Sequence, residues 1–130
     1  MIVDSSAVVA MLAREPDAAA LEAALARADE PVIGAATFVE ASTVVAARMH
    51  DGARAVRELL ESFGVEVVAI DEAGAAAAVD GWRRFGRGNH RARLNFGDCL
   101  TYGVAAVRGE PILCIGNDFV QTDATVVPLG

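Results

Sequence analysis

Short apolar runs alternate along the chain with longer segments in which apolar residues recur at helical spacing. The short runs are too brief for a helical period and rich in β-branched residues, which predicts strands at 1–3, 31–34, 65–70 and 112–115, with a last candidate at 125–127. The longer segments are predicted helices at 7–13, 18–28, 38–50, 53–63, 73–85 and 96–107. Strands that alternate with helices favour parallel βαβ units. We therefore expect an α/β fold of three layers, with a central, mostly parallel sheet flanked by helices.

The size and composition of the chain favour one folded unit. Its 130 residues match a common domain size and 54% of them are apolar, so a core can form and disorder is not expected. With no repeat, linker or low-complexity tail, we expect a single domain over residues 1–130. No apolar run approaches the roughly 20 residues of a membrane span, and no basic leader precedes Ile2. We therefore expect no membrane partner. Cys99 and Cys114 lack the spacing of a disulfide framework, which favours a reducing cytoplasm.

The charges of the chain are unevenly distributed. A formal charge of −7 argues against a protein that coats nucleic acid, because such binding depends on many Lys and Arg side chains. All eleven basic residues are Arg, and five of them crowd around His90 in one Gly-rich stretch, 83–93. Contact with a nucleic acid would therefore be local.

Four acidic residues are expected at one edge of the sheet. Asp4 and Asp118 follow predicted strands directly, while Glu40 and Asp98 lie in the first turns of predicted helices. Ligands of open α/β sheets gather beyond the carboxyl ends of the strands, so short connections would bring these acids together. Clustered carboxylates repel one another unless cations neutralise them, and their oxygens suit Mg²⁺ or Mn²⁺. Such metals activate water and stabilise a departing oxygen, which is the chemistry of phosphodiester hydrolysis.

Each of these acids also has a purely structural interpretation. Thr37 and Glu40 match a capping box, and Asp98 would stabilise the positive end of its helix. Gly116–Asp118 consists of residue types that are common in turns, so Asp118 would be a turn residue. Asp4 would serve as a helix N-cap, although Ser5 or Ser6 would do so equally well. The single residues therefore leave both roles open, and it is their joint pattern that favours a metal site.

Four successive motifs carry a resemblance to a known family. They are Ile2–Ala7, Thr37–Glu40, Leu94–Cys99 and Gly116–Phe119, and they resemble, in order and spacing, the motifs of VapC-type PIN-domain toxins. The resemblance covers the whole chain, and the segment around Gly97-Asp98-Cys99 is its most specific part.

The resemblance implies a PIN fold, a Mg²⁺-dependent endoribonuclease in which Mn²⁺ can substitute, a homodimer and a VapB-like antitoxin. Asp4 and Asp98 would be the main metal ligands, Glu40 would bind directly or through water, and Asp118 would be the fourth catalytic acid. Ser6 would support Asp4 by a hydrogen bond. The expected substrate is tRNA or another structured RNA.

The Arg-rich stretch is the expected contact with RNA phosphate, since guanidinium groups match phosphate oxygens. Its residues are Arg83, Arg84, Arg87, His90, Arg91 and Arg93. The alternative is a solvated loop that balances an acidic protein or contacts a partner. Trp82 and Phe85 flank the stretch and are expected to pack in the core.

Other functions remain to be distinguished. A catalytically silent Mg²⁺-binding module, such as a receiver domain, also places acids at strand ends, but receivers require a Lys and this chain has none. A structural protein would use the acids as caps and the Arg-rich stretch as an interface, and would bind no metal. His50, His90 and the two cysteines lack zinc-site spacing, and no His accompanies Cys99, so a zinc site and a thiol mechanism are not expected.

Overall fold

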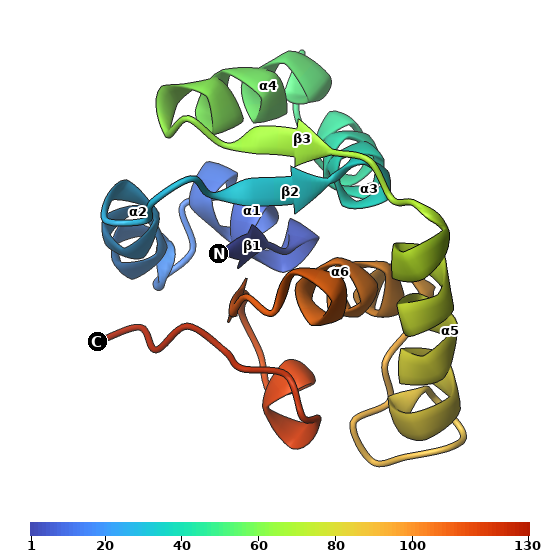
Figure 1. Ribbon diagram of the computed structural model, residues 1–130. Coiled ribbons are helices and arrows are strands. Elements are labelled where there is room, and N and C mark those ends of the chain that lie inside the picture. Colours follow the sequence, from blue (N-terminus) through green and yellow to red (C-terminus); the bar gives the residue numbers. More distant parts are fainter.

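A four-stranded parallel sheet forms the centre of the computed structural model, which describes residues 1–130 (Figure 1). Its strands are β1 (Ile2–Val3), β2 (Val32–Gly34), β3 (Glu66–Val68) and β4 (Ile112–Leu113), in the order β3-β2-β1-β4. Ile2 is paired with Val32 on one side and with Ile112 on the other. Because all neighbouring strands are parallel, their carboxyl ends meet at one edge of the sheet.

Helices connect the strands and cover the sheet. They are α1 (Ser5–Leu12), α2 (Ala18–Ala26), α3 (Ala35–Ala46), α4 (Gly52–Ser62), α5 (Glu72–Phe85) and α6 (Phe96–Arg108), and a 3₁₀ turn, η1 (Phe119–Gln121), follows β4. Every predicted helix is present, with ends that differ by a few residues from those expected. None of these helices combines the length and the apolar character that crossing a membrane requires.

Two local predictions were wrong. The segment 125–127 forms an isolated bridge between Val126 and Ile112 instead of a strand, and β4, its partner, is itself only two residues long. Helix α3 begins at Ala35, with Gly34 as its N-cap, so Thr37 is no cap and the proposed capping box with Glu40 does not form.

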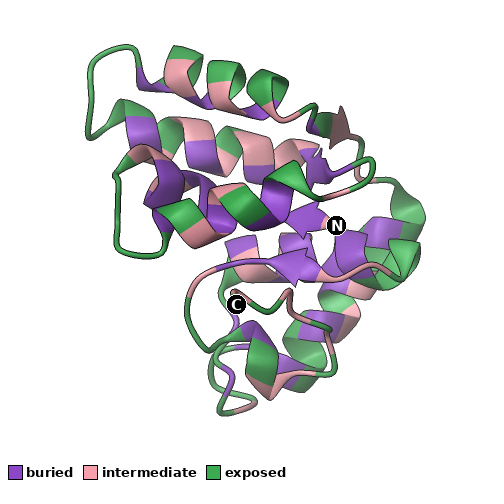
Figure 2. Ribbon diagram, turned by 90° about the vertical axis from the view of Figure 1, so that its left-hand side faces the viewer, coloured by how far each residue is buried: buried purple, intermediate pink, exposed green.

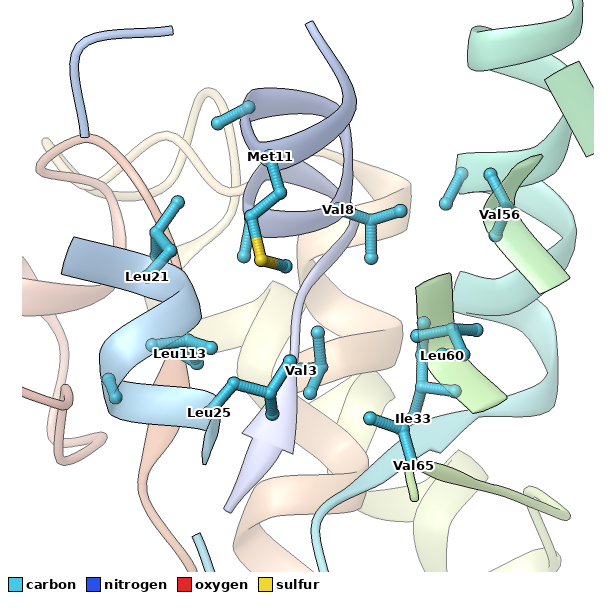
Figure 3. Packing of buried hydrophobic residues seen from close by; sticks show 14 of the residues in the cluster. Val3, Val8, Met11, Leu21, Leu25, Ile33, Val56, Leu60, Val65 and Leu113 are labelled. Atoms are coloured by element: carbon cyan, nitrogen blue, oxygen red, sulfur yellow. The ribbon is translucent and has the colours of Figure 1, made fainter. Parts of the chain in front are cut away.

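The sheet separates two apolar clusters, because successive side chains of a strand point to opposite faces. One residue of each of three strands faces α5 and α6 (Ile2, Val32, Ile112), and the next residue faces α1 to α4 (Val3, Ile33, Leu113). Figure 3 shows the second cluster, in which the strand residues meet apolar side chains of the helices. Figure 2 shows that the buried stretches of the helices face inward and the exposed ones face solvent. The helices thus form layers on both sides of the sheet.

Helices α5 and α6 pack closely through glycines. A Cβ atom on Gly103 would lie 2.5 Å from the carbonyl oxygen of Gly74, so only glycine fits this contact.

The buried stripe of α5 includes Phe85, as expected, but Trp82 lies beside the stripe and is 51% exposed. The expectation that Trp82 packs in the core was therefore wrong.

The successive strands are not all added on the same side of β1. From β1 the chain moves outward to β2 and β3, whereas β4 is added on the opposite side of β1. A crevice at the carboxyl ends of two such strands is where ligands bind in open α/β sheets. Asp4 follows β1 and Asp118 lies in the turn after β4, so both acids lie at this point.

Candidate active site

Asp4 is buried, with 3% of its surface exposed, and three donors hold its carboxylate. The amide N–H and the hydroxyl of Ser6 donate to Oδ2, at 3.0 and 2.7 Å, and the hydroxyl of Thr101 donates to Oδ1 at 2.6 Å. The Ser6 hydroxyl in turn accepts the N–H of Ile115 at 3.1 Å. Asp4 is therefore the N-cap of α1, and it is also tied to the segment after β4 and to α6.

Thr101 also contacts a second buried hydroxyl. Its Oγ1 lies 3.2 Å from Oγ1 of Thr37 in α3, and both side chains are almost fully buried. Glu40 lies one turn after Thr37 along α3, and Asp98 one turn before Thr101 along α6. Each helix therefore carries one threonine and one acid on the same face.

The carboxylate of Glu40 lies against the backbone of Gly97. A Cβ atom built on Gly97 would overlap both oxygens and the carboxyl carbon of Glu40. Since Gly97 immediately precedes Asp98, this contact brings the acid of α3 to the first turn of α6. Glu40 is half-buried, and it makes no ion pair.

Asp98 forms a capping box with Asn95. The amide of Asp98 donates to Oδ1 of Asn95 at 2.8 Å, and the amide of Asn95 donates to Oδ2 of Asp98 at 3.0 Å. The pKa of Asp98 is raised to about 6, mainly by burial and also by the negative charges of Asp4, Asp118 and Glu40, while the Asn95 hydrogen bond partly opposes the shift. Asp98 is thus close enough to the other three acids for the charge of each to act on it.

Asp118 is the most accessible of the four. It is exposed at the start of η1, and its side chain makes no capping hydrogen bond. Behind the acids, burial and the charges of Asp4, Asp118 and Asp98 raise the pKa of the Cys114 thiol to about 12, and burial followed by the charge of Asp98 raises that of Cys99. Both thiols therefore stay protonated at neutral pH, which argues against thiolate chemistry.

The donor chemistry of this edge suits a hard divalent cation. None of the four acids forms an ion pair, so no arginine neutralises their charges. As the side chains stand, no three acidic, histidine or cysteine side chains are grouped closely enough to hold one ion. Mg²⁺ commonly uses one or two protein carboxylates and completes its shell with water and phosphate oxygens, so the site fits this ion better than one that needs a full protein cage.

Comparison with known proteins identifies the family. A family model described as PIN domain matches residues 1–124. The chain belongs to the PIN-domain family. Ribonuclease VapC36 of Mycobacterium tuberculosis is 47% identical to this PIN domain over 125 residues, which are 95% of this chain and 90% of that protein.

Two solved structures share the fold of this PIN domain. The crystal structure of VapC20 of Mycobacterium tuberculosis, described as a sarcin–ricin-loop-cleaving toxin, has a TM-score of 0.77, with 19% identity over 97% of both chains. A toxin–antitoxin complex from Klebsiella pneumoniae has a TM-score of 0.73, with 16% identity over 98% of this chain and 96% of the other. The predicted VapC family, the α/β fold and the classification as a ribonuclease are confirmed.

Some side chains of the Arg-rich stretch have partners within the PIN domain, and others form no ion pair. Arg84 is paired with Asp80 and Asp123, and Arg83 lies 3.8 Å from Asp80. His90 shapes the loop, because its Nδ1 accepts the amide of Ala92 and its ring meets the edge of Phe85. In contrast, three exposed arginines form no ion pair: Arg87, Arg91 and Arg93.

The two threonines are the site residues that the sequence did not reveal. A threonine within an apolar helix carries no local sign of function, and Thr37 was assigned to a cap instead. The signal that could have found them is the spacing of three residues from Glu40 and from Asp98, which places each threonine on the face of its acid.

Proposed function

We propose that this PIN domain is the toxin of a type II toxin–antitoxin pair and that it hydrolyses RNA phosphodiester bonds with Mg²⁺, for which Mn²⁺ can substitute. The observation that carries the proposal is that the charges of Asp4, Glu40 and Asp118 all act on Asp98 at the β1–β4 edge, and that none of the four acids forms an ion pair. When bound there, the metal supplies an activated water and stabilises the leaving oxygen.

The acids have different roles in this proposal. Asp4 and Asp98 each keep an Oδ1 lone pair for the metal, because Ser6 and Asn95 occupy their Oδ2 atoms. Glu40 binds directly or through water from its position against Gly97. Asp118, which is exposed, is the fourth catalytic acid and orients water or substrate from the solvent side. Ser6 supports Asp4.

A cleavage assay tests the proposal. The purified, partner-free protein is incubated with tRNA and with total RNA, with and without Mg²⁺, beside the folded variants Asp4→Asn and Asp98→Asn. We expect discrete cuts that require Mg²⁺ and disappear in both variants. Intact RNA in every reaction, from protein that still binds Mg²⁺, would instead favour the catalytically silent Mg²⁺-binding module.

We infer that RNA phosphates contact the Arg-rich stretch, chiefly through Arg87, Arg91 and Arg93. These three arginines are unengaged, whereas Arg84 has internal partners. The substrate in this proposal is a structured RNA such as tRNA, in keeping with the description of VapC20 as a toxin that cleaves the sarcin–ricin loop.

Binding to the cleavage-deficient Asp98→Asn protein tests the RNA contact. The fluorescence of Trp82, the only tryptophan, reports from the helix beside this stretch. Changing the three arginines to Ala should weaken binding and reduce the slope of log affinity against log salt by about 2, at ~0.7 for each lost phosphate contact. Arg27→Ala is the matched control, since Arg27 is exposed at the end of α2 on the opposite edge. An unchanged slope would leave the stretch as a solvated loop or partner interface.

We further propose a VapB-like antitoxin, a homodimer and a cytoplasmic location. The support for a protein partner is an apolar band of exposed side chains across α3, α5 and α6, formed by Val39, Val79, Trp82 and Phe96. This band lines two adjoining grooves, one of about 620 Å³ between α5 and α6 and one of about 480 Å³ beside Glu40. Exposed apolar surface of this kind marks protein interfaces. The two free cysteines support a reducing compartment.

Light scattering tests the homodimer, and co-purification with a co-expressed VapB-like protein tests the antitoxin. We expect a dimer for the wild type, and weaker association in Phe96→Ser and Val79→Ser. A wild type that remains monomeric at high concentration would contradict the homodimer.

A further inference from the structure

Two buried threonine hydroxyls connect the acid-bearing helices to Asp4. Thr101 donates to Asp4 Oδ1 at 2.6 Å, and Thr37 lies 3.2 Å from Thr101, with 1% and 2% of these two threonines exposed. No solvent competes with these contacts, so they keep one geometry.

The chemistry of the groups fixes the direction of the hydrogen bonds. An ionised carboxylate only accepts, so the single proton of the Thr101 hydroxyl is used on Asp4. The remaining contact of Thr101 Oγ1 must then be as an acceptor, and Thr37 is the donor. The order of donation is therefore Thr37 to Thr101 to Asp4.

Counting lone pairs shows what remains on Asp4. A carboxylate offers about four acceptor positions, two on each oxygen. Ser6 uses two of them on Oδ2, through its N–H and its hydroxyl, and Thr101 uses one on Oδ1. The single free position lies on Oδ1, the atom that Thr101 orients.

We propose that Thr37 and Thr101 are a positioning pair that directs the one free lone pair of Asp4 toward the metal and sets the spacing between the helices that carry Glu40 and Asp98. The inference rests on the proposed function and adds two residues to it. Thr37 acts only through Thr101, and neither threonine binds the metal itself.

Substitutions by residues of similar size distinguish the effect of losing a hydroxyl group from the effect of changing the packing. Thr101→Val removes the donor to Asp4 and keeps the volume, Thr101→Ser restores the hydroxyl, and Thr37→Val removes the first donor. Ser42→Ala is the control, because the Ser42 hydroxyl in the same helix as Thr37 is buried and has no partner. Thermal unfolding confirms that each variant folds.

Mn²⁺ binding, measured by calorimetry without RNA, is the main measurement. Loss of a partner that orients a metal ligand typically weakens metal binding about 10- to 100-fold, and we expect this for Thr101→Val. Thr101→Ser should stay within about threefold of the wild type, and Ser42→Ala should match it. For RNA cleavage, kcat should fall in Thr101→Val while KM stays constant, because the substrate contacts are unchanged.

A double-mutant cycle tests the order of donation. If Thr37 acts through Thr101, Thr37→Val should weaken Mn²⁺ binding in the wild-type background and have no further effect in the Thr101→Val background. Additive losses would overturn the ordered pair, and so would Thr101→Val protein that binds Mn²⁺ with wild-type affinity. If Thr101→Val does not fold, the proposal is tested by Thr37→Val, which should weaken Mn²⁺ binding, and by Thr101→Ser, which should keep it within about threefold of the wild type. Absence of Mn²⁺ and Mg²⁺ binding in the wild type would overturn the proposed function together with the pair.

Discussion

Gly97 leaves the space that the Glu40 carboxylate occupies. The conflict with an added Cβ atom is at the end of the flexible Glu40 side chain, so a substitution would move Glu40 without breaking the helix. Local geometry at this one residue therefore affects the position of Glu40, a proposed catalytic acid, more than it affects the fold.

Gly97→Ala should remove most of the cleavage activity and leave the protein folded. Alanine favours an α-helix over glycine by about 0.5–1 kcal/mol, which offsets part of the strain, while Glu40 is displaced from its position. Activity and thermal unfolding are measured in parallel. In a Glu40→Gln background the same change should cost no further activity, and full activity of Gly97→Ala would show that the position of Glu40 against Gly97 is not required.

The raised pKa of Asp98, about 6, makes the metal-free protein sensitive to pH. Because the pKa is higher in the folded than in the unfolded state, the stability that Asp98 contributes is complete below about pH 4 and is lost as the pH rises through about 6. At pH 7.5 without metal, Asp98→Asn should therefore melt about 3–5 °C above the wild type, from roughly 1 kcal/mol after solvent screening.

The same pair of proteins provides the control. Near pH 3 the two melting temperatures should agree, because Asp98 is then mostly protonated in both the folded and the unfolded state. Saturating Mg²⁺ should stabilise the wild type at pH 7.5 and have little effect on Asp98→Asn. A wild type that is the more stable protein without metal at pH 7.5 would contradict the raised pKa.

At the scale of single residues, the sequence indicated the four candidate acids but not the two threonines that contact each other beside Asp4. Asp4, Glu40, Asp98 and Asp118 follow from the ends of predicted strands and helices. Their structural roles were also partly right, since Asp4 is an N-cap and Asp98 is part of a capping box. The contact between Thr37 and Thr101 joins residues 64 positions apart, and no local pattern encodes such a contact.

At the scale of elements, Arg84 and Tyr102 attach the C-terminal segment to α5 and α6. Asp123 accepts the Tyr102 hydroxyl at 2.7 Å and the Arg84 guanidinium at 3.0 Å. The pKa of Tyr102 is raised to about 12, mainly by burial and also by the hydrogen bond to Asp123 and the charge of that carboxylate. The charge of Arg84 partly opposes this shift. This attachment holds the segment that follows η1 and Asp118 against the two helices.

Tyr102 is the only tyrosine, so tyrosinate absorbance reports on this attachment alone. In the folded protein its midpoint should lie near pH 12, against about 10 in denaturant. The stability that this group contributes is complete below about pH 10 and is lost as the pH rises through 12. Asp123→Asn should lower the midpoint. A folded-state midpoint near 10 would show that Tyr102 is neither buried nor bonded to Asp123.

Element types were easier to predict than element ends. All six helices and four strands were predicted from the pattern of apolar residues, because each helix buries side chains and three of the four strands are fully buried. The end positions were harder, because α3 begins before Thr37, at Ala35, and Val126 pairs only with Ile112, and neither fact follows from a local pattern. The exposure of Trp82 likewise depends on how α5 lies against α6.

At the scale of the whole molecule, the prediction of a single domain can be tested by unfolding. The two apolar clusters share the strands of one sheet, so we expect them to unfold together. Trp82 and Tyr102 both lie on the α5–α6 side, whereas far-ultraviolet circular dichroism reports on all helices. The three signals should give one midpoint in urea. Aromatic signals that change before the dichroism would indicate two units instead of one domain.

The order of the site residues along the chain has a consequence for biosynthesis. A ribosome releases the N-terminal part first, and the segment up to Val68 already contains β1, β2 and β3, together with Asp4 and Glu40. Asp98 and Thr101 emerge much later, and β4 and Asp118 later still. A growing chain, or one that terminates before Asp98, therefore lacks half of the four acids, and the proposed metal site cannot assemble until residues 98–118 have been synthesised.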